Sequence, residues 1–187
     1  MNMTKGKLLV ISGLSAGAGK DSLRSLFLAK HPDWQQPLST TTRGSRLGEE
    51  HSKQMSFVTK ETFEAWKAEG KFLETDFHAD NWYGTLREPV ETLLGQGKNV
   101  LLRIDVNGAL QVKRELPEAL VVFVKAESFD ALEKRMIERG HTAEEIKARL
   151  KLAKKELELE PQFENVVVNE TGKLDEALAA IEAVAAV

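Results

Sequence analysis

Residues 13–22 read Gly13-Leu-Ser-Ala-Gly-Ala-Gly-Lys-Asp-Ser22, and this glycine-rich stretch decides the fold. The apolar run Lys7-Leu-Leu-Val-Ile11 before it predicts a buried strand, and residues 23–29 after it have helical spacing. A strand, a glycine-rich turn and a helix in this order form a cradle for phosphate, because consecutive backbone N–H groups and the positive helix end face the anion. We therefore predict a nucleoside-triphosphate loop rather than a plain tight turn.

The loop departs from the usual spacing of Gly, four residues and Gly-Lys. Leu14 stands where the first glycine belongs, so the loop is one residue longer than standard. Asp21 replaces the usual Ser or Thr, and its charge is unfavourable beside phosphates unless it points away or faces a metal. Ser22 is then the nearest hydroxyl for a magnesium ion that accompanies the triphosphate. The expected contacts with the triphosphate in this loop are Gly13, Gly17, Gly19, Lys20, Asp21 and Ser22.

Composition limits the class of protein. The chain has 187 residues, of which 42% are hydrophobic and 29% charged, so we expect one globular domain. A net charge of -3 argues against nonspecific binding to nucleic acid or to an anionic membrane. The absence of cysteine excludes disulfides, thiolate metal sites and a Cys nucleophile. Residues 1–7 are too short for the charged region of a signal peptide, and the apolar run after them breaks at Gly13, too early for a membrane span, so we expect a cytoplasmic protein.

Apolar runs alternate with helical patterns along most of the chain. This alternation predicts an α/β fold, with a parallel sheet flanked by helices on both faces and right-handed crossovers. The Ala-rich segment at the end should pack on the sheet as a closing helix. The predicted strands are 8–11, 99–104, 120–124 and 165–168, and the predicted helices are 21–30, 87–95, 107–115, 128–139, 142–159 and 174–186.

Residues 38–86 break this rhythm. They are polar and rich in Thr, Arg and Glu, with a short strand pattern at 55–58 and an amphipathic helix near 62–69. We interpret them as an inserted subdomain at the open edge of the sheet. A second charged stretch, 151–160, is expected to form the solvated face of a helix.

A second candidate phosphate site lies in the inserted segment. Residues 39–49 read Ser39-Thr-Thr-Thr-Arg43-Gly-Ser-Arg46-Leu-Gly48-Glu49, with two arginines among hydroxyls. The guanidinium fork matches phosphate oxygens and the hydroxyls add neutral donors, although a basic surface turn has the same composition. A second phosphate cluster after a triphosphate loop favours phosphoryl transfer, because that reaction needs both an anionic acceptor and a donor.

The chain resembles a guanylate kinase. The resemblance rests on six motifs that occur in the family's order and cover nearly the whole chain. They are Ser39–Glu49, Phe72-Leu-Glu74, Tyr83-Gly-Thr85, Ile104–Gly108, Arg135–Gly140 and Val167-Val-Asn169.

The resemblance implies an enzyme that phosphorylates GMP to GDP with ATP and Mg²⁺. It also implies a P-loop core (1–37, 87–128 and 160–187), a GMP-binding subdomain (38–86) and a helical lid (129–159). ATP and GMP would be its partners, without nucleic acid or membrane, and the chain would be a monomer or a homo-oligomer.

The family's functional residues carry over to matching positions. The resemblance implies that the GMP phosphate is held by Ser39, Arg43, Arg46 and Tyr83, and that guanine is read by Glu74, Thr85 and Asp105. Two lid arginines and the last motif would bind ATP, through Arg135, Arg139 and Asn169. The catalytic residues would be Lys20, Arg135 and Arg149. Without the resemblance, the lid arginines would be interpreted as part of a solvated helix.

Two further departures from the family pattern concern its binding residues. Met55 stands where the family has a tyrosine that donates to the GMP phosphate, and a thioether has no proton to donate. Arg103 stands where the family has an acidic residue two positions before Asp105. Two other functions therefore remain open: a ribose bisphosphate kinase of the same fold, suggested by the Gly-Lys-Asp-Ser string, and a non-catalytic guanylate-kinase-like binding domain.

Overall fold

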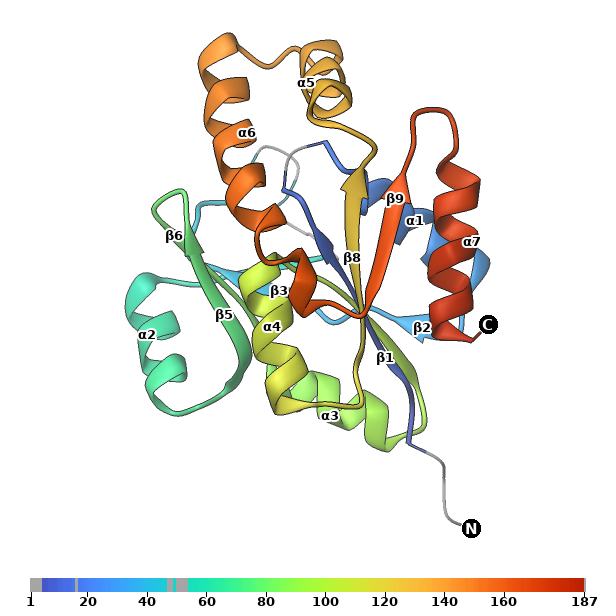
Figure 1. Cartoon of the computed structure of the whole chain (residues 1–187). Helices are drawn as coiled ribbons and strands as arrows, with labels where there is room; N and C mark the ends of the chain where they lie inside the picture. Colours follow the sequence, from blue (N-terminus) through green and yellow to red (C-terminus); the bar gives the residue numbers. More distant parts are fainter. Residues whose placement is uncertain (1–4, 16, 47–48, 50–53, 187) are drawn as a thin grey trace. The chain divides into compact units, whose positions relative to one another are not determined.

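The structure is a computed structural model that describes residues 5–15, 17–46, 49 and 54–186 (Figure 1). The chain divides into two compact units, the first built from Met1–Leu8, Asp33–Leu102 and Asn107–Ala119, the second from Leu9–Pro32, Arg103–Val106 and Leu120–Val187. Its strands form one sheet with the order β2-β7-β1-β8-β9 and another with the order β4-β3-β6-β5. The pairings β1–β8, β8–β9 and β2–β7 are parallel, which confirms the predicted α/β class.

The predicted strands and helices are all present, and their ends agree with the prediction to within a few residues. Four strands have no predicted counterpart: β2, which is only two residues long, and β3, β5 and β6 of the four-stranded sheet. The elements are β1 (Leu8–Gly13), α1 (Lys20–Lys30), β2 (Trp34–Gln35), β3 (Ser39–Thr41), β4 (Met55–Phe57), α2 (Lys60–Ala68), β5 (Phe72–His78), β6 (Asn81–Leu86), α3 (Arg87–Gly95), β7 (Asn99–Arg103), α4 (Val106–Glu115), β8 (Leu120–Ala126), α5 (Phe129–Glu138), α6 (Ala143–Leu157), a 3₁₀ turn (Glu160–Gln162), β9 (Asn165–Asn169) and α7 (Leu174–Ala185).

In the second unit, the strands form a core because their residues are almost continuously apolar. All six residues of β1 are buried, and Ile11 pairs with Val122 of β8. The strand β9 is at the end of the sheet, and its Val166 and Val168 are 38% and 41% exposed. The prediction of strands buried on both faces is therefore correct for β1 and wrong for β9, because an edge strand is covered less completely.

Helix α7 packs against β8, β9 and α1, as Figure 1 shows for its place beside β9 and α1. Its residues Ala177, Leu178 and Ile181 are at most 2% exposed. Their spacing of one and three places them on one face, so the Ala-rich segment closes the sheet as predicted.

Helices α5 and α6 form a pair whose ends are set by capping residues (Figure 1). The Ser128 hydroxyl accepts from the Ala131 N–H, and Thr142 forms a capping box with Glu145. Gly140, with φ 78°, follows α5 in the left-handed conformation that commonly ends a helix. The predicted helix stop and restart are both confirmed.

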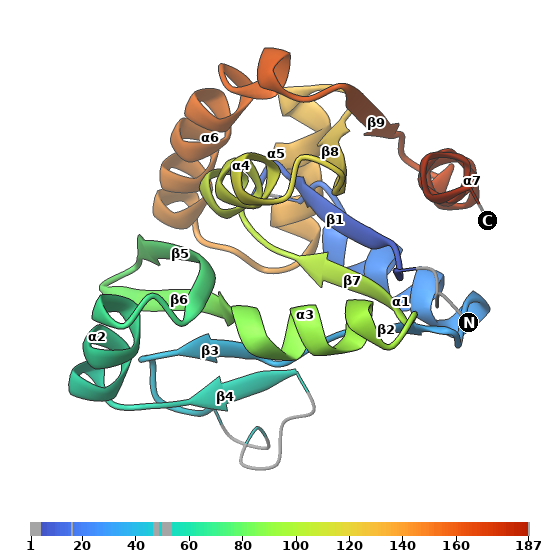
Figure 2. The same ribbon diagram turned by 90° about the horizontal axis from the view of Figure 1, so that it is seen from below.

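In the first unit, the four-stranded sheet is built around the β5–β6 hairpin (Figure 2). The hairpin turn consists of Ala79 and Asp80, whose φ values of 48° and 59° match a tight two-residue turn. The strand β3 pairs with β6 in antiparallel fashion and with β4 in parallel. Phe63 of α2 is fully buried, and its ring stacks on that of Phe72 with ring centres 4.3 Å apart. This stacking attaches α2 to the sheet.

Candidate active site

The glycine-rich loop lies between β1 and α1, as predicted. Gly13 has φ 122° and Gly19 has φ 88°, a conformation that favours glycine. A Cβ on Gly13 would lie 2.0 Å from the Val124 carbonyl oxygen, and one on Gly19 would lie 2.3 Å from the Asn169 Nδ2 atom. Gly13 therefore requires glycine for two reasons, its backbone conformation and the neighbouring backbone of Val124, whereas Gly19 requires it mainly for its backbone conformation.

Lys20, the first residue of α1, places its ammonium group inside this loop. The residue is 5% exposed, and Nζ donates to the Gly13 carbonyl oxygen at 2.6 Å. Asp105, which the resemblance assigns to guanine, lies 3.5 Å from the same Nζ. Burial lowers the pKa of Lys20 below its ordinary value, although the charge of Asp105 opposes this. An anion bound at the loop would stabilise the charged form of this lysine.

Asp21 points at an arginine. Arg103 donates from Nε and Nη2 to the two carboxylate oxygens of Asp21, at 3.0 and 2.8 Å. Partial desolvation by the groups around it disfavours the Asp21 carboxylate, but the hydrogen bonds and charge of Arg103 outweigh this effect and hold the pKa of Asp21 below its ordinary value. Ser22 is exposed in the first turn of α1. The expectation that Asp21 points away or faces a metal is replaced by a direct ion pair.

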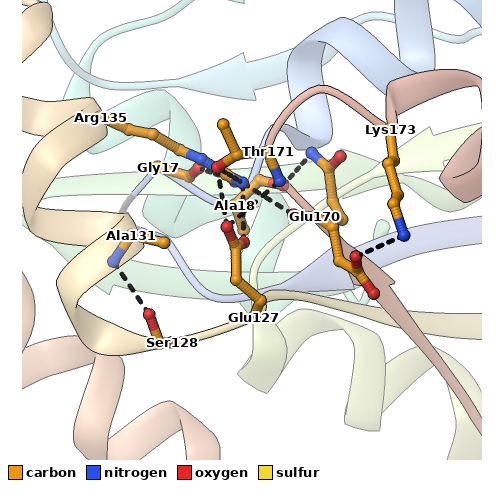
Figure 3. A network of polar contacts seen from close by, with 10 residues as sticks. Gly17, Ala18, Glu127, Ser128, Ala131, Arg135, Glu170, Thr171 and Lys173 are labelled. Carbon is orange, nitrogen blue, oxygen red and sulfur yellow. Dashed lines mark hydrogen bonds and ion pairs between the residues drawn. The ribbon is translucent and has the colours of Figure 1, made fainter.

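Arg135 of α5 connects its helix to the phosphate loop (Figure 3). Its side chain is 15% exposed, and Nη1 donates to the Gly17 carbonyl oxygen at 3.2 Å. The Nη2 atom donates to Glu127 at 2.9 Å, to the Asn169 carbonyl oxygen at 2.8 Å and to the Thr171 hydroxyl at 3.0 Å. A guanidinium fork suits such a set of acceptors, which an ammonium group could not bridge.

The remaining ATP candidates differ in their surroundings. The Asn169 Nδ2 atom donates to the Ala18 carbonyl oxygen at 2.9 Å, which fixes the end of β9 to the loop. Arg139 is the C-cap of α5 and Arg149 lies on α6, and both are exposed. The structure thus brings Asn169 and Arg135 to the loop and leaves the other two arginines at the surface of the helical pair.

Two carboxylates at this site were missed by sequence reasoning. Glu127 follows β8 directly, and its position at the carboxyl end of a parallel strand was the available signal. Glu156 lies in the charged stretch that was predicted to be a solvated helix face, but it is only 7% exposed. That prediction is wrong at Glu156 because its carboxylate accepts hydrogen bonds from Ser15.

The first unit holds the candidate base-binding pair. Glu74 of β5 and Thr85 of β6 face each other in register and are 5% and 1% exposed. The Thr85 hydroxyl donates to the Glu74 Oε1 atom at 2.7 Å. A Cβ on Gly108 of α4 would lie 2.5 Å from the other carboxylate oxygen, so glycine leaves room for this side chain. The structure thus brings together two of the three residues that the resemblance assigns to base recognition, whereas the third, Asp105, contacts Lys20.

Arg43 is held by a carboxylate of its own motif. Its guanidinium donates to the two Glu49 carboxylate oxygens at 2.7 and 3.0 Å, and the Arg46 N–H donates to the same carboxylate at 3.0 Å. These interactions, with the Arg43 hydrogen bonds as the largest cause, lower the pKa of Glu49 to about 2. Gly48 lies outside the described residues. The Arg46 side chain is exposed.

Other candidates for the acceptor site lie on neighbouring strands. Ser39 of β3 pairs in register with Met55 of β4 on one side and with Thr85 of β6 on the other. The Tyr83 ring stacks on His78, with ring centres 4.1 Å apart and an interplanar angle of 6°. This stacking fixes the direction of the only tyrosine in the chain.

A phosphate loop that joins a buried parallel strand to a helix, with a buried lysine inside it, defines an α/β nucleotide-binding protein of the P-loop class. The family model for guanylate kinase matches residues 5–186. Guanylate kinase from Synechocystis sp. is 43% identical over 93% of this chain and 90% of that protein. Guanylate kinase from Clostridium perfringens strain 13 is 40% identical over 96% and 82%, respectively.

The likeness extends to a solved structure. The crystal structure of guanylate kinase from Anaplasma phagocytophilum matches with a TM-score of 0.77 and 25% identity, over 97% of this chain and 85% of that one. The chain therefore belongs to the guanylate kinase family and is an enzyme of that type. These matches do not favour the ribose bisphosphate kinase or the non-catalytic binding domain. Within the described residues, every helix is too short or too polar to cross a membrane.

Proposed function

We propose that this chain transfers the γ-phosphoryl group of ATP to GMP, with GDP and ADP as products. The observation that carries the choice of acceptor is the buried carboxylate of Glu74, oriented by the Thr85 hydroxyl. Guanine presents two donors to a carboxylate, its N1–H and its exocyclic amine, whereas adenine presents an acceptor at N1. A buried carboxylate facing that acceptor would receive no hydrogen bond from the base, which disfavours AMP by about 1–3 kcal/mol.

The phosphate loop supplies the donor side of the reaction. Lys20 would contact the β- and γ-phosphates, and the loop N–H groups would surround them. Arg135 and Asn169 hold the loop, and Arg139 and Arg149 would contribute positive charge to ATP from the helical pair. Catalysis would then consist of positioning and electrostatic stabilisation rather than covalent chemistry.

Mg²⁺ fits the oxygen donors present beside Lys20. Ser22 is exposed in the first turn of α1, while the Asp21 carboxylate accepts hydrogen bonds from Arg103. Since Mg²⁺ keeps several waters and binds largely through substrate phosphates, one protein hydroxyl is a sufficient direct contact. The ion would neutralise phosphate charge when bound, and Ser22 would orient it.

The functional division of the chain is part of the proposal. Residues 38–86 would form the acceptor-binding subdomain, through Ser39, Arg43, Arg46 and Tyr83 on the GMP phosphate. Residues 129–159 would form the lid. A cytoplasmic location and a monomeric or homo-oligomeric state stay predictions of the sequence.

An assay of ADP release with GMP, AMP and ribose bisphosphate tests this function. We expect activity with GMP and a loss of about ten- to a hundredfold in kcat/KM for GMP in Glu74→Ala, the scale of one to three kcal/mol. Glu88→Ala, which removes an exposed glutamate of α3, is the matched control and should keep full activity. Equal rates with all three acceptors would refute the proposal.

A further inference from the structure

Glu156 of α6 binds the phosphate loop with both of its carboxylate oxygens. The Ser15 N–H donates to Oε2 at 2.8 Å, and the Ser15 hydroxyl donates to Oε1. The residues are 141 positions apart in sequence, and the glutamate is 7% exposed. A buried carboxylate that directs both oxygens to one residue makes charge-assisted hydrogen bonds, which are stronger than those between neutral groups.

The helical pair holds the loop at a second point. Arg135 of α5 donates to the Gly17 carbonyl oxygen, two residues beyond Ser15. The two contacts therefore lie on either side of position 16, in the part of the loop that is one residue longer than the usual pattern. One contact fixes an N–H group through an anion, and the other fixes a carbonyl group through a cation.

We propose that Glu156 is a positioning residue for the ATP phosphates, because it holds the lengthened loop through Ser15 in the conformation that receives them. A longer glycine-containing loop has more backbone conformations to lose when it binds a ligand. A loop that is already ordered before ATP arrives loses less freedom on binding, and its affinity for ATP is higher. The inference rests on the proposed function, since it requires the loop to bind ATP.

The negative charge of Glu156 suggests an alternative role, competition with the ATP phosphates, and the titration described below distinguishes competition from positioning. A carboxylate that accepts from a loop N–H could compete with a phosphate for that donor. The competition predicts tighter ATP binding when the carboxylate is removed, whereas positioning predicts weaker binding. The burial of Glu156 and its use of the Ser15 side chain as well as the backbone favour positioning.

Calorimetric titration of the full chain with ATP and with GMP, in separate experiments, tests the inference. Glu156→Ala should raise the dissociation constant for ATP about tenfold, the scale of one or two lost hydrogen bonds, and leave that for GMP unchanged. Glu156→Gln should recover most of the ATP affinity, because its amide can accept from the Ser15 N–H and donate to the Ser15 hydroxyl. Glu158→Ala, at an exposed position of the same segment, is the matched control and should bind like the unmodified chain.

Ser15→Ala provides a second test that does not depend on the folding of Glu156→Ala. It should weaken ATP binding by about threefold through loss of the hydroxyl alone, and the double variant should bind ATP like Glu156→Ala. Unchanged or tighter ATP binding in Ser15→Ala or Glu156→Ala, measured on folded protein, would overturn the inference. If the unmodified chain binds ATP and phosphorylates GMP in that case, the proposed function stands and only the role of Glu156 falls.

Discussion

Arg103 and Asp21 neutralise each other through two hydrogen bonds, of 3.0 and 2.8 Å, at the start of α1. Taken singly, each residue departs from the family pattern in a way that disturbs a phosphate site. Together they restore a neutral pair, because the carboxylate next to Lys20 faces a guanidinium. Their side chains are 33% and 63% exposed, so the pair should contribute little to stability and act mainly on the local charge.

We predict that Arg103→Ala raises the KM for ATP by about tenfold, because Asp21 then keeps only its longer ion pair with Arg24, at 4.0 Å, and its negative charge beside the phosphates is compensated less. Asp21→Ser in the same background should restore most of the affinity. The free energy of unfolding should change by less than about 1 kcal/mol in either variant, as for other exposed pairs. Steady-state kinetics at varied ATP, with a urea titration of each variant, measure both quantities. An Arg103→Ala variant with unchanged KM would show that the pair has no influence on ATP.

A second prediction concerns Gly108, which faces Glu74 from α4. Alanine normally favours a helix over glycine by about 1 kcal/mol, but here its Cβ would lie 2.5 Å from a Glu74 carboxylate oxygen. Gly108→Ala should therefore displace Glu74 and lower kcat/KM for GMP by about tenfold or more, with little effect on ATP binding. Gly95→Ala is the matched control, since a Cβ there meets no atom within 4 Å. Equal GMP kinetics in the two variants would contradict the assigned position of Glu74.

Much of the fold could be predicted because strands such as β1 are buried on both faces. Such strands consist mostly of apolar residues, and these runs are visible in the sequence. The helix boundaries at Ser128 and Thr142 were visible for a similar reason, since capping is a local interaction. The short strand β2 and the exposed side of β9 were not predictable, because they depend on which strand lies next to them. Burial at an edge depends on topology rather than on local sequence.

The site was less predictable where it depends on contacts between distant segments. Glu74 and Thr85 were found through the motifs, and the hairpin places them in register. Nothing local distinguishes Glu156 from the exposed charges around it, since its partner Ser15 is far away in sequence. The pairing of Asp21 with Arg103 was missed for the same reason, because each residue was judged separately.

The ion pair of Arg43 and Glu49 leads to a prediction about pH. The pKa of Glu49 is lowered from 4.5 to about 2, so its contribution to the folded state is complete above about pH 4.5 and is lost as the pH falls toward 2. A carbon NMR titration of the Glu49 carboxyl group should give a pKa of about 2 in the unmodified chain. Arg43→Ala should return it toward 4.5, whereas Arg24→Ala, in the other unit, should not change it. A pKa near 4.5 in the unmodified chain would mean that the pair does not persist in solution.

Substitutions at Arg135 and Arg139, the two arginines of the Arg135–Gly140 motif, should distinguish an effect on stability from an effect on activity alone. Arg135 is 15% exposed and donates to four oxygen acceptors, so Arg135→Ala leaves Glu127 and two backbone carbonyl groups without this donor. We expect it to lower the free energy of unfolding by about 2–3 kcal/mol and also to reduce activity. Arg135→Lys should recover little of the lost stability, because an ammonium group lacks the planar fork.

Arg139 is an exposed C-cap, and Arg139→Ala should change the free energy of unfolding by less than about 0.5 kcal/mol while lowering kcat/KM for ATP. Urea denaturation and steady-state kinetics of the three variants provide the comparison, and equal loss of stability at positions 135 and 139 would refute the distinction between them.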